Sequence, residues 1–169
     1  NPWRLAILFI PGVLGHVILP LLSNLNADST LQKYYKMLKL SILLNAGITL
    51  AVVLPLIFSS HIIMIAYGTD YANGELVFRV LAFSAVLIAI NNVVGQAIIS
   101  RGKMWIAFIF NTLWAITLLS SLIVLLDYGY GAFGLACAML IAYFFHTVWQ
   151  GIYLTKILGI TNRTILTKN

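Results

Sequence analysis

Residues 76–126 decide the fold class: LVFRVLAFSAVLIAINNVVGQAIIS (76–100), RGK (101–103) and MWIAFIFNTLWAITLLSSLIVLL (104–126). Each apolar run is long enough to cross the roughly 30 Å hydrocarbon layer of a bilayer as a helix, which takes about 20 residues. The basic turn between the runs leaves room only for an antiparallel return. The stretch therefore predicts two membrane-spanning helices joined as a hairpin.

The rest of the chain has the same character. Of its 169 residues, 62% are hydrophobic and 8% are charged, against about 25% charged residues in a typical soluble domain. We expect an all-α, polytopic membrane helical bundle with about five transmembrane helices in a single membrane domain, residues 1–169. The first segment is interrupted by Pro11 and Gly12, which predicts a broken helix. The expected spans are residues 3–22, 40–58, 76–100, 104–126 and 132–155.

The basic residues indicate an orientation. The loops 23–39 and 101–103 and the tail after 155 contain most of the Lys and Arg residues, which favour the cytoplasmic side of a membrane. We therefore expect a multi-pass protein of a bacterial inner membrane, with the N-terminus of this chain outside and the C-terminal tail in the cytoplasm. The basic residues form no dense run, so nucleic acid is not an expected partner. Those on the predicted cytoplasmic side are Lys33, Lys36, Lys39, Arg101, Lys103, Lys156, Arg163 and Lys168.

Polar side chains within the expected spans are the candidates for function, because polar groups are costly in hydrocarbon. In the third span, amides recur on a loose stripe that fits the wall of a water-lined cavity. A histidine also lies in the broken first span, where unwound backbone lines substrate paths in several transporter folds. Interhelical hydrogen bonding is the alternative role for all of them. The substrate-cavity candidates are His16, Asn91, Asn92, Gln96, Asn111, His146 and Gln150.

The sequence contains few residues suited to catalysis or metal binding. No acidic residue lies in the middle of an expected span, and the lone Cys137 sits in a small-residue run where packing is the ordinary role. The expected outer loops hold His61, Asp70, Glu75 and Asp127 without a paired-carboxylate or nucleophile and base arrangement. We expect no catalytic residue, no metal and no cofactor, and we expect that the protein is not an enzyme.

Five short motifs resemble those of the polysaccharide and O-antigen flippases, in the multidrug, oligosaccharidyl-lipid and polysaccharide (MOP) exporter superfamily. They are ILPLLS at 18–23, AYGTDY at 66–71, RVLA at 79–82, RGK at 101–103 and YGAFGLA at 130–136. Members of that superfamily have two six-helix bundles around a cavity that opens alternately to each side. The five spans expected here would match the last five of one bundle.

The resemblance implies flipping of an undecaprenyl-pyrophosphate-linked oligosaccharide across the bilayer for lipopolysaccharide or other surface polysaccharide synthesis. The family's basic cavity residues attend the pyrophosphate, and in this chain Arg4 and Arg79 are the candidates for that contact. Other polysaccharide-assembly membrane proteins are candidate partners, besides the lipid bilayer itself. Three alternatives stay open: a multidrug exporter of the related branch, a polymerase or glycosyltransferase of the same pathway, and a scaffold subunit whose polar residues only join helices.

Overall fold

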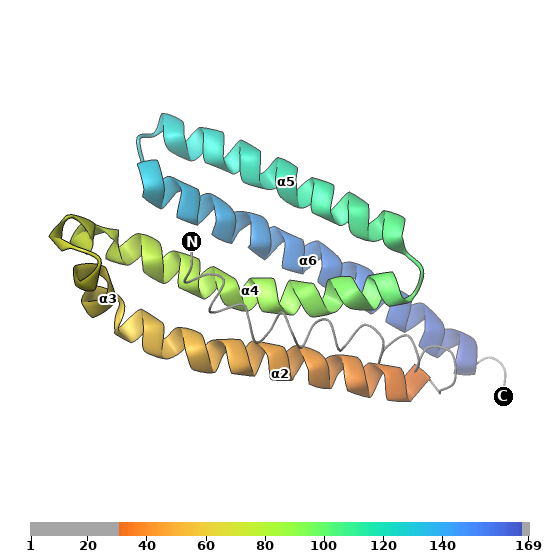
Figure 1. The fold of residues 1–169 in the computed structure, drawn as a ribbon. Helices are drawn as coiled ribbons and strands as arrows, with labels where there is room; N and C mark the ends of the chain where they lie inside the picture. Colours follow the sequence, from red (N-terminus) through yellow and green to blue (C-terminus); the bar gives the residue numbers. More distant parts are fainter. Residues whose placement is uncertain (1–30, 167–169) are drawn as a thin grey trace.

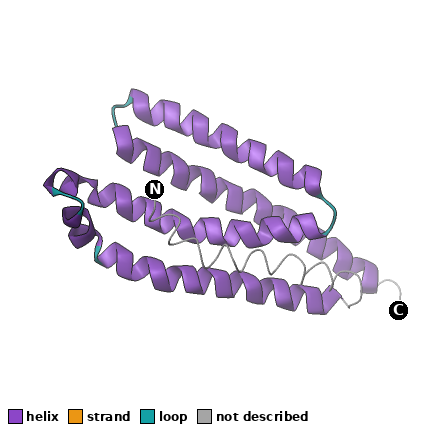
Figure 2. Ribbon diagram, viewed as in Figure 1, coloured by secondary structure: helices purple, strands orange, loops and turns teal. Residues whose placement is uncertain are grey.

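The computed structural model describes the backbone of residues 31–166 and the side chains of residues 34–68, 71 and 73–156. Every element in this part is a helix, which confirms the all-α class (Figure 2). The expected first span, residues 3–22, lies outside the described residues. The elements are α2 (Leu31–Phe58), α3 (Ser60–Ala66), the 3-10 helix η1 (Thr69–Gly74), α4 (Glu75–Ser100), α5 (Met104–Asp127) and α6 (Gly131–Leu166).

Four of these helices are long and apolar enough to cross a membrane. Their candidate spans are Tyr34–Phe58, Glu75–Ser100, Met104–Asp127 and Gly131–Lys156. The second and third agree closely with the sequence prediction, because Arg101, Gly102 and the Tyr128–Gly129 turn stop the helices there. Gly102 and Gly129 have φ angles of 70° and 81°, in the left-handed region that glycine adopts without strain.

The other two candidate spans contain the expected spans 40–58 and 132–155. Helix α2 is continuous from Leu31, so the candidate span Tyr34–Phe58 begins before residue 40. Helix α6 continues to Leu166, so the residues that follow the expected span, as far as Leu166, are helical as well. The connection between α2 and α4 is formed by α3 and η1.

The four long helices lie side by side in the order α2, α4, α6, α5, as Figure 1 shows. Helix α4 packs against both α2 and α6, whereas α5 packs mainly against α6. The expected hairpin of α4 and α5 is antiparallel, but the contacts between these two helices are fewer. Ala107 of α5 packs against Val94 and Ile98 of α4 near the connecting turn. A space between α4 and α5 can therefore open further from the turn.

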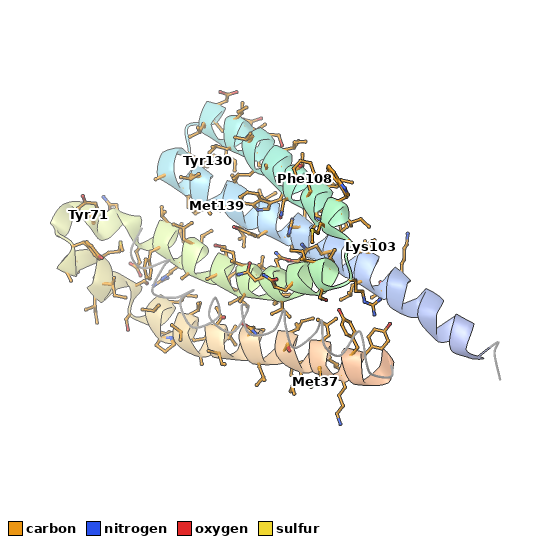
Figure 3. All side chains as sticks on the ribbon, turned by 45° about the vertical axis from the view of Figure 1, so that its right-hand side comes forward. Met37, Tyr71, Lys103, Phe108, Tyr130 and Met139 are labelled. Carbon is orange, nitrogen blue, oxygen red and sulfur yellow. The ribbon has the colours of Figure 1, made fainter. Side chains whose placement is uncertain are left out.

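Helix α4 is the centre of the described core. In an 18-residue window of its candidate span, 56% of the residues are buried, against 6% in the corresponding window of α5. On one side, Val53 of α2 packs against Ala82 and Ala85 of α4. The small alanine side chains let the two backbones approach, as in other membrane helix pairs. The exposed side of α5 is apolar, as expected for a surface in contact with lipid or with further helices (Figure 3).

Candidate functional site

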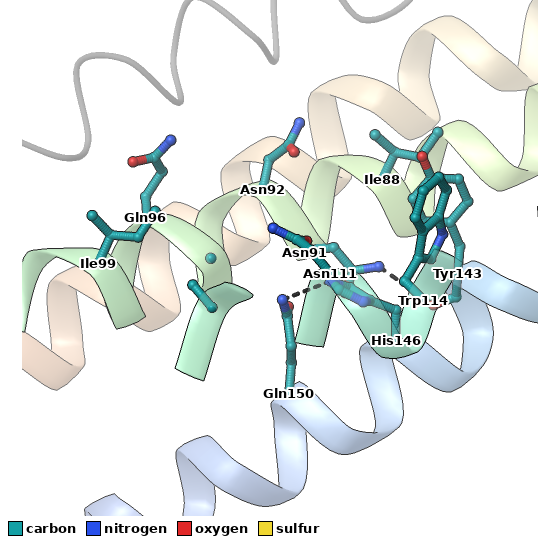
Figure 4. A pocket seen from close by; sticks show the side chains of 12 residues that line it. Ile88, Asn91, Asn92, Gln96, Ile99, Asn111, Trp114, Tyr143, His146 and Gln150 are labelled. Atoms are coloured by element: carbon teal, nitrogen blue, oxygen red, sulfur yellow. Dashed lines mark hydrogen bonds between the residues drawn. The ribbon is translucent and has the colours of Figure 1, made fainter. Parts of the chain in front are cut away.

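A cleft of about 290 Å³ lies between α4, α5 and α6, and most of its lining side chains are polar or aromatic. We call it the polar cleft. None of the residues that line it carries a formal charge when histidine is neutral. Its walls are formed by Ile88, Asn91, Asn92, Gly95, Gln96, Ile99, Ala107, Asn111, Trp114, Tyr143, His146 and Gln150 (Figure 4).

The cleft lies deep in the candidate spans. Asn91 on α4 and His146 on α6 are each at least about two helical turns from either end of their spans. Polar groups at this depth are costly unless they find partners in protein, in water or in a substrate. Helical periodicity brings these side chains to the cleft, because residues four apart lie on the same face of a helix. Asn92 and Gln96 are four residues apart on α4, and so are His146 and Gln150 on α6.

Asn91 joins the two walls of the cleft. Its Nδ2 donates a hydrogen bond of 3.3 Å to the backbone carbonyl of Tyr143 on α6. Its side-chain oxygen Oδ1 is buried, and no described group donates to it. Asn91 therefore has two roles available: it holds α4 to α6, and it keeps one acceptor for another ligand.

His146 and Gln150 form a polar pair on α6. The amide nitrogen Nε2 of Gln150, which can only donate, lies 2.7 Å from Nε2 of His146. This ring nitrogen therefore accepts, and the neutral ring carries its proton on Nδ1. Both residues are buried, and His146 Nδ1 has no hydrogen-bond partner among the described groups. Within the described part of the chain, Gln150 Oε1 receives no hydrogen bond.

The remaining amides differ in exposure. Asn92 and Asn111 are exposed, so their amide groups stay available at the open side of the cleft. Gln96 is half-buried, and its Oε1 is covered without a hydrogen-bond donor among the described groups. The cleft thus offers both donors and acceptors, which suits a ligand with several hydroxyl groups.

Two aromatic side chains complete one wall. The rings of Trp114 and Tyr143 have centroids 5.2 Å apart and planes inclined by 44°. The indole nitrogen of Trp114 is buried and donates to no described acceptor. The sequence prediction missed both residues, because an aromatic residue in an apolar run is usually a packing or interfacial group. Only the packing of α5 against α6 shows that Trp114 and Tyr143 line the same cleft as the amides.

The structure therefore brings six of the predicted cavity residues to one cleft: Asn91, Asn92, Gln96, Asn111, His146 and Gln150. That they contact a substrate stays a prediction. A different polar stripe, on α2, bonds to its own backbone instead: Asn45 donates to the Ser41 carbonyl at 3.0 Å and Thr49 donates to the Asn45 carbonyl at 2.7 Å. His16 and Arg4 lie outside the described residues.

Arg79 lies near the start of α4, away from the cleft. Its Nε donates a 2.8 Å hydrogen bond to Ser60 Oγ, and its Nη2 pairs with Glu75. Twelve residues separate Arg79 from Asn91, or about 18 Å along a helix. A contact between Arg79 and a substrate pyrophosphate stays a prediction, and it would require a substrate that extends beyond the cleft. No cluster of His, Cys, Asp and Glu that could hold a metal occurs among the described side chains.

The fold and the cleft define a class: a helical, multi-span membrane protein with an uncharged polar cleft at membrane depth. The chain is 29% identical over 142 residues to the EPS I polysaccharide export inner membrane protein EpsE of Ralstonia nicotianae. It is 27% identical over 142 residues to the protein of the same name from Ralstonia solanacearum. Each similarity covers 83% of this chain and 32% of the relative, so the chain spans about a third of the length of these relatives. No protein-family model and no solved structure matches the chain.

Proposed function

We propose that this chain is part of an inner-membrane transporter for polysaccharide export, and that it moves a lipid-linked oligosaccharide across the bilayer by alternating access. The observation that carries the proposal is the group of buried, unpaired polar atoms around one cleft. They are Asn91 Oδ1, Gln96 Oε1, Gln150 Oε1, His146 Nδ1 and Trp114 Nε1. Each would recover a hydrogen bond from a sugar hydroxyl or from water that accompanies it.

The chemistry of the cleft supports a sugar more than a lipophilic cation. Amide groups donate and accept hydrogen bonds, as sugar hydroxyls do. The Trp114 and Tyr143 rings offer apolar faces on which the C–H face of a pyranose can pack. A binding site for a cationic drug would gain from a carboxylate, and none lines the cleft. The two relatives bear names that refer to polysaccharide export, in agreement with this assignment.

The orientation belongs to the same proposal. The exposed lysines Lys36, Lys39, Lys103 and Lys156 lie at the end of the bundle where α2 and α5 begin and α4 ends. Glu75 and Asp127 lie at the opposite end. Positive residues favour the cytoplasmic side. We therefore place the lysine-rich end in the cytoplasm and the Tyr128–Gly129 turn outside.

Complementation of a strain that lacks the full-length gene tests the proposal. We expect Asn91→Leu combined with Gln96→Leu to abolish or strongly reduce surface polysaccharide while the protein stays inserted at normal abundance. Ser120→Leu is the control, because Ser120 lies on α5 away from the polar cleft and its hydroxyl bonds the Thr117 carbonyl of its own helix. Normal polysaccharide in the double variant would contradict the proposal. A loss of drug resistance instead would favour the multidrug alternative, and accumulation of unpolymerised repeat units outside the inner membrane would favour a polymerase.

A further inference from the structure

Arg101, the first residue after α4, lies against an aromatic ring. Its guanidinium carbon lies 4.6 Å from the centroid of the Tyr34 ring. Tyr34 is 1% exposed, and its hydroxyl donates to the Ala97 carbonyl at 3.2 Å. The ring covers one face of the guanidinium, and the N–H groups of the guanidinium point outward in its own plane, where they can donate hydrogen bonds.

The edge of this guanidinium has no partner in the described part of the protein. Nε and Nη2 are buried, and neither donates a hydrogen bond to a described group. The Tyr153 phenol of α6 interacts with Arg101 electrostatically, but a phenol does not neutralise the charge. The described carboxylates, Glu75 and Asp127, lie at the other end of the bundle. Because an unpaired buried charge is costly, the arrangement suits an external anion.

The position of Arg101 indicates where this anion comes from. The candidate span of α4 ends at Ser100 and that of α5 begins at Met104, so Arg101 lies at the level where the phosphates of a bilayer lie. Lys103, which Figure 3 shows at this end of the bundle, is exposed. Gly102, with a φ of 70°, has open space where a Cβ would be, and an anion would reach the buried Nε and Nη2 atoms of Arg101 once the guanidinium turns toward it.

The polar cleft ends close to this position. Ile99, which lines the cleft, precedes Arg101 by two residues, and Gln96 precedes it by about 7.5 Å along the helix. A lipid whose phosphate contacts Arg101 would have its headgroup next to the amides of the cleft.

We propose that Arg101, oriented by Tyr34, binds a lipid-borne phosphate group at the lysine-rich end of the bundle. Turning the Nε and Nη2 edge toward the headgroups gives the paired, charge-assisted hydrogen bonds that arginine forms with phosphate. The phosphate belongs either to a bulk anionic phospholipid or to the lipid carrier of a substrate; only the second case rests on the proposed function.

The test measures lipid binding by the full-length protein in nanodiscs of phosphatidylcholine that contain phosphatidylglycerol or undecaprenyl phosphate. Bound lipid is counted by native mass spectrometry. We expect Arg101→Gln to weaken binding of at least one of these lipids by roughly tenfold, as the loss of a charge-assisted pair predicts. We expect Arg101→Lys, which keeps the charge but lacks the planar pair of N–H donors, to weaken binding less. Lys103→Gln is the matched control and should change binding less than about twofold.

The two lipids distinguish the sources. An effect confined to undecaprenyl phosphate assigns the site to the carrier, whereas an effect on phosphatidylglycerol alone assigns it to bulk lipid and leaves the transport proposal unaffected. Either result supports the phosphate site. Equal binding of both lipids by the wild type and Arg101→Gln would overturn it.

A structural role for Arg101 would give a different result. Asp28 lies outside the described residues but precedes α2, and it is the acid nearest in sequence to Tyr34. If Arg101 only paired with Asp28, Arg101→Gln and Asp28→Asn would lower thermal stability equally in neutral and in anionic nanodiscs. That outcome would overturn the proposal. We expect instead that anionic lipid stabilises the wild type and the Asp28→Asn variant, and not Arg101→Gln.

Discussion

Gln150 donates to His146 across one turn of α6, with 2.7 Å between the two Nε2 atoms, and both side chains face the polar cleft. The bond leaves Gln150 Oε1 as an acceptor in the cleft and fixes the imidazole tautomer. A pair that only joined helices would bond across an interface, whereas this one bonds within its own helix. Its side chains therefore shape the cleft more than they connect its walls.

A double-mutant cycle measures the strength of this bond. Gln150→Leu should lower the unfolding free energy by about 1–2 kcal/mol, because it leaves the buried His146 nitrogen unpaired. His146→Leu combined with Gln150→Leu should cost less than the sum of the single changes, with a coupling of about 0.5–1.5 kcal/mol. Reversible unfolding of the full-length protein in mixed micelles gives these values. Additive effects would show that the two side chains are not coupled.

The α5–α6 interface depends on Gly134. A Cβ added there would lie 3.1 Å from Tyr130 Cβ and 3.2 Å from Leu125 Cβ, both too close for an ordinary contact. Gly134→Ala should therefore destabilise the fold by about 1–3 kcal/mol, as overpacking does. Gly151→Ala is the control on the same helix, since nothing lies within 4 Å of its added Cβ. Equal thermal stability of the two variants would contradict the described packing.

Tyr34 contributes to the stability of the fold in two separable ways. Tyr34→Phe removes the hydrogen bond to Ala97 but retains the ring beneath Arg101. We expect it to lower the unfolding free energy by about 1 kcal/mol while leaving the cation–π contact intact. Tyr34→Leu removes both and should cost more. If Tyr34→Phe and Tyr34→Leu have the same unfolding free energy, the contact between the ring and Arg101 does not contribute to stability.

Site-directed labelling tests the orientation. In a background with Cys137→Ala, cysteine at position 103 should react with a membrane-impermeant maleimide only after the inner membrane is permeabilised. Cysteine at position 128 should react in intact spheroplasts. The reverse pattern would show that the lysine-rich end faces outward, against the positive-inside expectation.

The sequence predicted the helices well because length and hydropathy act locally. The spans of α4 and α5 agree within about a residue, since the turn residues that end them are adjacent in the chain. The candidate span of α6 also agrees within about a residue with the expected 132–155, and helical hydrogen bonding continues past Lys156 into the expected polar tail. The order of helices, with α6 beside α5 and α4, depends on contacts that no local pattern contains.

The polar lining was predicted because placing an amide in hydrocarbon costs free energy. Asn91, Gln96 and Gln150 were therefore candidates for a functional role. Trp114 and Arg101 were not. An indole in an apolar run is usually a packing or interfacial group, and an arginine in a basic turn is explained by the cytoplasmic preference of basic residues. Only the placement of Trp114 in the cleft and of Arg101 above Tyr34 shows that their polar atoms are unpaired.

The central claim is that the polar cleft carries a lipid-linked oligosaccharide. The most direct measurement is translocation of such a lipid by the full-length protein in proteoliposomes, with accessibility to a lectin as the readout. We predict that Asn91→Leu with Gln96→Leu lowers the translocation rate by roughly tenfold or more, as the loss of two hydrogen bonds to a moving ligand implies, while Ser120→Leu translocates at the wild-type rate. Equal rates in all three proteins would contradict the account.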